Sequence, residues 1–223
     1  MKKIAFLAAI LMLTTAVSAQ NDTAAKKFRF DFHGFVNPHF YADSRSVVGG
    51  REDMMLFYPK PVALDAAGRD LNEGWQANMM TITTRLNLLI TGPDILGAHT
   101  VAFIEGDFTG STNASNNDLR LRHAYISLDW ERGGALLVGQ YWYAMVVPEI
   151  MPMTNPLNMG APFHPYARYN QVRYRIPLGP VEIAATAMWQ LDKASQGLLN
   201  GAAATSTLFA RNSLVPELNL RVM

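Results

Sequence analysis

The chain has 223 residues, 49% of them apolar and 17% charged, and its formal net charge is +1 at pH 7. This length suits one sizeable domain, and the charge content is too low for a disordered chain. The sequence has no cysteine, which excludes disulfides, thiolate metal sites and cysteine nucleophiles. Nearly balanced charge without basic runs argues against nucleic acid as a partner.

Residues 1–19 have the composition of a secretory signal peptide. Lys2 and Lys3 precede an apolar run over 4–13, and small residues end the segment at Ala19, where we expect cleavage. The run is shorter than the roughly 20 residues that a membrane-spanning helix needs. We therefore predict an exported protein in which residues 20–27 form a short periplasmic segment before the folded domain.

Residues 28–43 alternate between an apolar and a polar face, which predicts one long β-strand. Strands of soluble proteins usually have about 5–6 residues, so a strand of this length with one apolar face favours a bilayer crossing. Phe30 and Phe40 lie ten residues apart. In a tilted strand this corresponds to roughly 24 Å along the membrane normal, which suits two aromatic girdles.

The same alternation predicts seven further strands, over 80–90, 98–109, 119–130, 135–143, 168–176, 181–192 and 211–223. Short turns alternate with longer loops, which we expect over 44–74, 113–117, 144–166 and 193–208. This layout is typical of an outer-membrane barrel, whereas a secreted β-sandwich rarely needs strands of such length. We predict an all-β chain that forms a transmembrane antiparallel up-and-down β-barrel, with about eight strands present.

Arg120 and Arg122 break this alternation, because both share the parity of the apolar face of their strand. Two explanations are open. Either a β-bulge turns the arginines toward the other face, or this part of the strand extends beyond the bilayer.

The last strand ends at Val222 and Met223 without the aromatic residue that usually closes an outer-membrane barrel. The chain could form a complete eight-stranded barrel, but such barrels have little room for a folded-in loop. We expect instead the N-terminal half of a barrel of about sixteen strands, with a truncated barrel domain over 28–223 and an inserted loop over 144–166.

The residues LRLRHAYI at 119–126, followed by LVGQYW at 137–142, resemble a hairpin of trimeric porins of the DcaP type, which are related to phosphate-selective porins. The last strand, with Pro216, is similar to a P-x-L strand of that family. The resemblance implies a sixteen-stranded homotrimer with a constricting loop after the fifth strand, where this sequence has the proline-rich segment 144–166. The sequence lacks the family's C-terminal half and the N-terminal coiled coil of some members.

The selectivity of a porin comes from charged side chains that line its narrowing. The alternation places two sets of charges on the inner face. The basic set is Arg29, Arg85, Arg173, Arg175 and Arg221, and the acidic set is Asp31, Glu105, Asp107, Glu182 and Glu217. In the constricting loop, Glu149, Asn155 and His164 are the polar groups best placed to reach the pore. Arginine binds carboxylate and phosphate bidentately, so one hypothesis is a preference for anionic or carboxylated solutes. The other is a nonselective lumen.

Catalysis is not expected. His33 and His39 share a face, but six strand residues separate them by about 20 Å, too far for one metal ion. The sequence has no metalloprotease, hydrolase-elbow or phosphate-loop motif. We therefore expect no cofactor and no metal, and as partners the outer-membrane lipid of a Gram-negative bacterium and small hydrophilic solutes. The alternatives are a small structural or adhesive barrel without an open pore, and a barrel enzyme assembled across strands.

Overall fold

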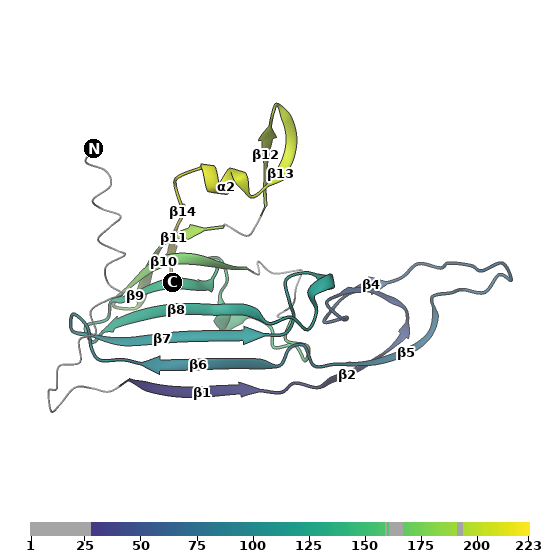
Figure 1. The fold of residues 1–223 in the computed structure, drawn as a ribbon, viewed down its shortest axis with the longest axis horizontal. Coiled ribbons are helices and arrows are strands. Elements are labelled where there is room, and N and C mark those ends of the chain that lie inside the picture. Colours follow the sequence, from purple (N-terminus) through teal and green to yellow (C-terminus); the bar gives the residue numbers. More distant parts are fainter. Residues whose placement is uncertain (1–27, 159, 161–166, 191–193) are drawn as a thin grey trace.

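The computed structural model describes residues 28–158, 160, 167–190 and 194–223, and its main feature is one antiparallel sheet of eight strands (Figure 1). The strands, in spatial order, are β1 (Arg29–Phe35), β6 (Arg85–Thr91), β7 (Ala98–Asp107), β8 (Arg120–Trp130), β9 (Ala135–Trp142), β10 (Arg168–Leu178), β11 (Val181–Trp189) and β14 (Glu217–Val222). This order is an up-and-down meander, and it confirms the predicted fold class. The sheet is open: β1 and β14 are its two edges. Among the described residues, no helix has the length and hydropathy to span a membrane.

The two faces of the sheet differ sharply in chemistry. Each of the eight strands of the sheet exposes large apolar side chains on its outer face. Examples are Phe32, Leu86, Ile104, Ile126, Val138, Val172 and Leu220. The buried apolar clusters are small by comparison, with three residues each. Such a continuous exposed apolar surface would be a liability in water, and it is what contact with lipid requires.

The prediction of one strand over 28–43 is wrong at its middle, where the chain breaks into β1 and β2 (His39–Arg45). Pro38 has no N–H for a strand ladder. At the break, the Asn37 backbone N–H donates to Thr84 Oγ1 at 3.2 Å and the Asn37 side chain donates to Thr83 Oγ1 at 2.8 Å. Phe30 and Phe40 therefore lie in different sheets, because β2 pairs with β5 (Glu73–Met80) in a separate two-stranded sheet.

The predicted loop 44–74 contains further structure, and it extends away from the main sheet in Figure 1. Its strands β3 (Val47–Gly50) and β4 (Met55–Pro59) form a hairpin nested inside β2 and β5. Beyond it, the N–H groups of Ala63 and Asn72 donate to Asp70. These bonds hold the pKa of the Asp70 carboxyl below its usual range and keep it charged toward Arg45, 2.7 Å away.

Segment 193–208, predicted as a loop, is also structured where it is described. It contains a hairpin of β12 (Ser195–Leu199) and β13 (Ala202–Ser206), followed by the short helix α2 (Leu208–Asn212). The last strand therefore begins at Glu217 rather than near residue 211, directly after Pro216. The other long loops carry the short 3₁₀ turns η2 (Asn113–Ser115) and η3 (Pro148–Ile150).

A β-bulge in β8 decides how Arg120 and Arg122 face. Glu105 of β7 pairs with His123, and the next residue, Gly106, pairs with Leu121, which leaves Arg122 as the extra residue. The bulge reverses the parity on its N-terminal side, so both arginines turn to the inner face. Of the two explanations left open by the sequence, the bulge is correct.

Two neighbouring residues of β9 accommodate β8 at this point. The side chain of Gln140 donates to the carbonyl oxygens of Leu121 and Arg122 at 3.1 and 3.0 Å, so both carbonyls at the bulge are satisfied. Gly139 has a φ of +133°, and a Cβ there would lie 2.2 Å from the Ala124 oxygen. Gly139 therefore allows β8 and β9 to approach closely, and Gln140 satisfies the carbonyl oxygens of the bulge beside it.

Candidate pore wall and constriction

Five charged residues on β6, β7 and β8 form a compact network, here called the paired cluster: Arg85, Glu105, Asp107, Arg120 and Arg122. Arg122 contacts Glu105 at 2.6 Å and Asp107 at 2.8 Å, and Arg120 contacts Asp107 at 2.7 Å. Arg85 lies 3.8 Å from Glu105. Asp107 and Arg122 are almost fully buried, so their charges satisfy one another and have little contact with solvent.

An aromatic patch lies beside the paired cluster and is centred on His123. The rings of Phe103, Tyr125, Tyr141 and Trp142 lie with their centroids 5.1–6.4 Å from the His123 ring. The guanidinium of Arg168 lies 3.9 Å from the Trp142 ring centroid and bonds to His123 Nε2 at 3.4 Å. The patch therefore separates the paired cluster from the charges of β10, β11 and β14.

A second group of charges surrounds a cavity of about 280 Å³ on the inner face. This group, here called the open cluster, consists of Arg173, Arg175, Arg221, Asp129, Glu149 and Glu182. Arg175 lies 3.5 Å from Glu182 and 4.0 Å from Asp129, long distances for ion pairs. Arg173 and Arg221 instead donate to the backbone oxygens of Trp142 and Val146, at 2.8 and 3.3 Å.

The loop that follows β9 contributes to this cavity. Ala144 and Val146 are buried, and Pro148 and Glu149 line the cavity opposite the strands. The Tyr143 hydroxyl donates to Glu217 at 2.8 Å, and Gln190 also donates to Glu217. The start of the proline-rich segment is therefore attached to the inner face of the sheet.

The predicted site residues fall into four groups in the structure. Arg85, Glu105 and Asp107 belong to the paired cluster, whereas Arg173, Arg175, Arg221, Glu182 and Glu149 belong to the open cluster. Glu217 holds the loop through Tyr143. Arg29 and Asp31 pair with each other on the edge strand β1 at 2.7 Å, apart from both clusters.

The two other nominated loop residues, Asn155 and His164, are not among the described residues that line the cavity. Asn155 is exposed and does not line the cavity, and its neighbour Asn158 instead donates to the Met54 oxygen at 2.9 Å. Met54 follows the β3–β4 turn, where Arg51 donates to the backbone oxygens of Thr109, Gly110 and Ser111. These contacts connect three long loops. His164 lies outside the described residues.

Sequence reasoning did not nominate Arg120, Arg122, Asp129 or the aromatic patch. Asp129 has the inward parity of β8, so the alternation contained the signal for it. Arg120 and Arg122 face inward only because of the bulge, and the one sign of this bulge in the sequence is that both arginines break the alternation. The patch depends on register, because its rings come from β7, β8 and β9.

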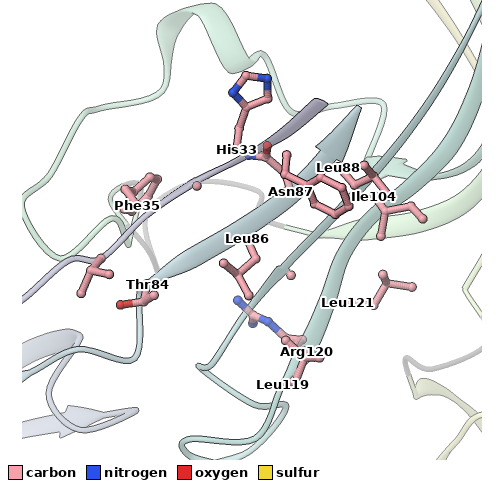
Figure 2. A pocket seen from close by; sticks show the side chains of 14 residues that line it. His33, Phe35, Thr84, Leu86, Asn87, Leu88, Ile104, Leu119, Arg120 and Leu121 are labelled. Carbon is pink, nitrogen blue, oxygen red and sulfur yellow. The ribbon is translucent and has the colours of Figure 1, made fainter. Parts of the chain in front are cut away.

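A larger hollow, about 1150 Å³, lies elsewhere and is shown in Figure 2. It spans β1, β6, β7 and β8 on the apolar face, and Figure 2 shows Leu86, Leu88 and Ile104 along it. Gly34 and Gly106 also line it and have no side chain to fill it. Its mainly apolar lining is continuous with the exposed apolar surface of the sheet and lacks the clustered charges of the smaller cavity.

The chain is similar to the crystal structure of the outer membrane channel DcaP of Acinetobacter baumannii. The TM-score is 0.53 and the sequence identity is 24%, over 80% of this chain and 46% of that channel. The chain therefore has a porin-like fold, and it spans less than half of the channel's length. No protein-family description matches the chain, and no curated protein matches it.

Proposed function

We propose that this protein is an outer-membrane porin that lets small hydrophilic solutes diffuse passively and favours anionic or carboxylated ones. The observation that carries this proposal is the division of one sheet into an apolar exposed face and a charged face onto which the loop after β9 folds. A wall with lipid on one side and water on the other needs this arrangement. Similarity to a channel supports it at the level of the fold.

The arginines of the wall support the anionic preference. The paired cluster has three arginines against two carboxylates, so this part of the inner face carries an excess of positive charge. Arg173 and Arg221 have backbone oxygens as their hydrogen-bond acceptors, and neither forms an ion pair with a carboxylate of the described residues. The proposal includes export by the signal peptide, the outer membrane of a Gram-negative bacterium, a homotrimer and a barrel of about sixteen strands in the full-length protein. It assigns no catalytic residue.

Planar-bilayer recordings on the refolded full-length protein test this proposal. We expect stepwise conductance and, in a potassium chloride gradient, a reversal potential whose sign shows anion preference. A protein that inserts as a heat-modifiable monomer without conductance would instead be a structural barrel. Conductance with cation preference would support a porin and contradict the proposed anion preference.

A further inference from the structure

The open cluster contains equal numbers of positive and negative residues around one cavity. Three arginines face Asp129, Glu149 and Glu182, so the formal charges of the lining cancel. A cavity suited to simple anions would carry an excess of positive charge. Equal numbers of opposite charges at separate positions favour a solute that itself carries both signs.

The strand register separates the charges along one row of the inner wall. Asp129 of β8 pairs with Ala135 of β9, which pairs with Arg175 of β10. Arg175 pairs with Ala184 of β11, which pairs with Arg221 of β14. Asp129 and Arg221 are therefore four strand spacings apart, roughly 19 Å along the sheet. The alanines between the charged positions have small side chains and leave room for a solute.

The basic end of the cavity has unused hydrogen-bonding capacity. Arg173 is 91% buried, since its exposed fraction is 9%, yet its Nε has no hydrogen-bond partner among the described residues. Neither Arg173 nor Arg221 forms an ion pair within the described part of the chain. A buried donor without an acceptor is costly, and a guanidinium fits a carboxylate well. A solute carboxylate would satisfy this end.

The acidic side has an excess of carboxylates. Asp129 and Glu182 share Arg175 at 4.0 and 3.5 Å, so one guanidinium faces two negative groups. Glu149 reaches the cavity from the loop, and it has no ion pair with any described residue. An ammonium group of a solute would complement these carboxylates. Tyr125 and Tyr141, whose ring centroids lie 5.2 Å apart, also line the cavity.

We infer that this cavity binds small zwitterions, that is, carboxylates that also carry an ammonium group, such as amino acids and short peptides. Arg173 and Arg221 hold the carboxylate, and Glu149, which reaches the cavity from the loop, holds the ammonium. The cavity of about 280 Å³ lies near the lower end of ligand pockets, ~300–1,000 Å³, which suits solutes of this size. The inference rests on the proposed function, because it names the class of carboxylated solute that the pore wall favours.

Binding to the folded full-length protein in detergent micelles tests the inference without relying on conduction. Ligand-observed NMR titration gives the Kd of 4-aminobutanoate, a zwitterion, and of pentanoate, an anion with the same number of non-hydrogen atoms. A partly exposed ion pair contributes up to about 1 kcal/mol, so we expect 4-aminobutanoate to bind about 5-fold more tightly. Equal affinities for the two probes overturn the inference.

Variants assign the two ends of the solute. Glu149→Gln should remove the advantage of 4-aminobutanoate and leave pentanoate unchanged, whereas Arg221→Gln should weaken both probes. Arg221→Gln is preferred to a change at the buried Arg173, which could impair folding. Glu131→Gln on a short turn and Arg69→Gln in the outer loop are matched controls and should change neither Kd.

Conduction, recorded on the same preparations, separates the two proposals. A channel without zwitterion preference retains the proposed function and overturns this inference. Zwitterion binding that depends on Glu149 in a protein that does not conduct retains the inference about the site and overturns the porin. An unchanged ratio of the two Kd values in Glu149→Gln overturns the assignment of the ammonium site.

Discussion

The paired and open clusters use the same residue types on the same wall, but they differ in how these residues are partnered. In the paired cluster every carboxylate meets an arginine within 3 Å, and Asp107 is 1% exposed. In the open cluster the corresponding distances are 3.5 and 4.0 Å, and a cavity lies between the charges. Charge on one face of this sheet therefore takes two forms: tight pairs that stabilise the strands, and loose groups that the proposed function makes available to solutes.

The largest expected effect is that of Asp107→Asn on stability. Asp107 accepts hydrogen bonds from Arg120, Arg122 and Thr109, and its loss leaves the buried Arg122 and the partly buried Arg120 without that charge. Breaking such a buried pair costs about 3–5 kcal/mol of unfolding free energy. Urea unfolding followed by heat-modifiable gel mobility measures it.

The matched control for this variant is Asp31→Asn, which breaks the more exposed pair with Arg29 on β1. That change should cost no more than about 1 kcal/mol. Similar losses in the two variants would mean that the paired cluster contributes no special stability, and the contrast between the clusters would then fail.

Gln140→Ala should have a smaller effect, through the bulge that places Arg122. Without the amide, the carbonyl oxygens of Leu121 and Arg122 lose their side-chain donor, a loss of about 1–3 kcal/mol. The urea midpoint reports the loss, and Gln196→Ala in the β12–β13 hairpin serves as the control. If Gln140→Ala keeps the wild-type midpoint, the bulge does not need its cap.

Arg221→Gln should have the smallest effect on stability and a clear effect on selectivity. Its guanidinium donates one 3.3 Å hydrogen bond to the Val146 oxygen, so the unfolding free energy should fall by no more than about 1 kcal/mol. The reversal potential in a salt gradient should move toward zero, because one unpaired positive charge has left the wall. An unchanged potential with a large loss of stability would place Arg221 with the structural pairs.

The alternation of side chains predicted the fold class and the two faces because a strand in a membrane must satisfy lipid and water at every second residue. Val172 and Arg173, for example, take the sides that parity assigns. The same rule nominated four of the open-cluster residues that lie on strands: Arg173, Arg175, Glu182 and Arg221. The prolines of 144–166 also predicted that this segment is not a strand, since proline lacks the N–H that a strand ladder needs.

The remaining features depend on relations that a single strand does not encode. Arg122 turns inward only because one residue of β8 has no partner in β7. The break at Pro38 needed Thr83 and Thr84, from the turn between β5 and β6, to accept the hydrogen bonds of Asn37. Whether an inward acid is paired depends on register, which places Glu105 beside Arg122, and on the course of the loop after β9, which leaves Glu149 facing a cavity.

The nested hairpins between β1 and β6 have a consequence for the order of folding. Direct closure of the chain from β1 to β6 costs about 2 kcal/mol more conformational entropy than closure of the short turn between β6 and β7. Pairing that starts at the left-handed Arg51–Asp53 turn, proceeds through β3–β4 and β2–β5, and ends at β1–β6 closes only short loops. On this route β1 joins the sheet last, and its pairing with β6 begins at Phe35 and Arg85, the end nearest the nested hairpins.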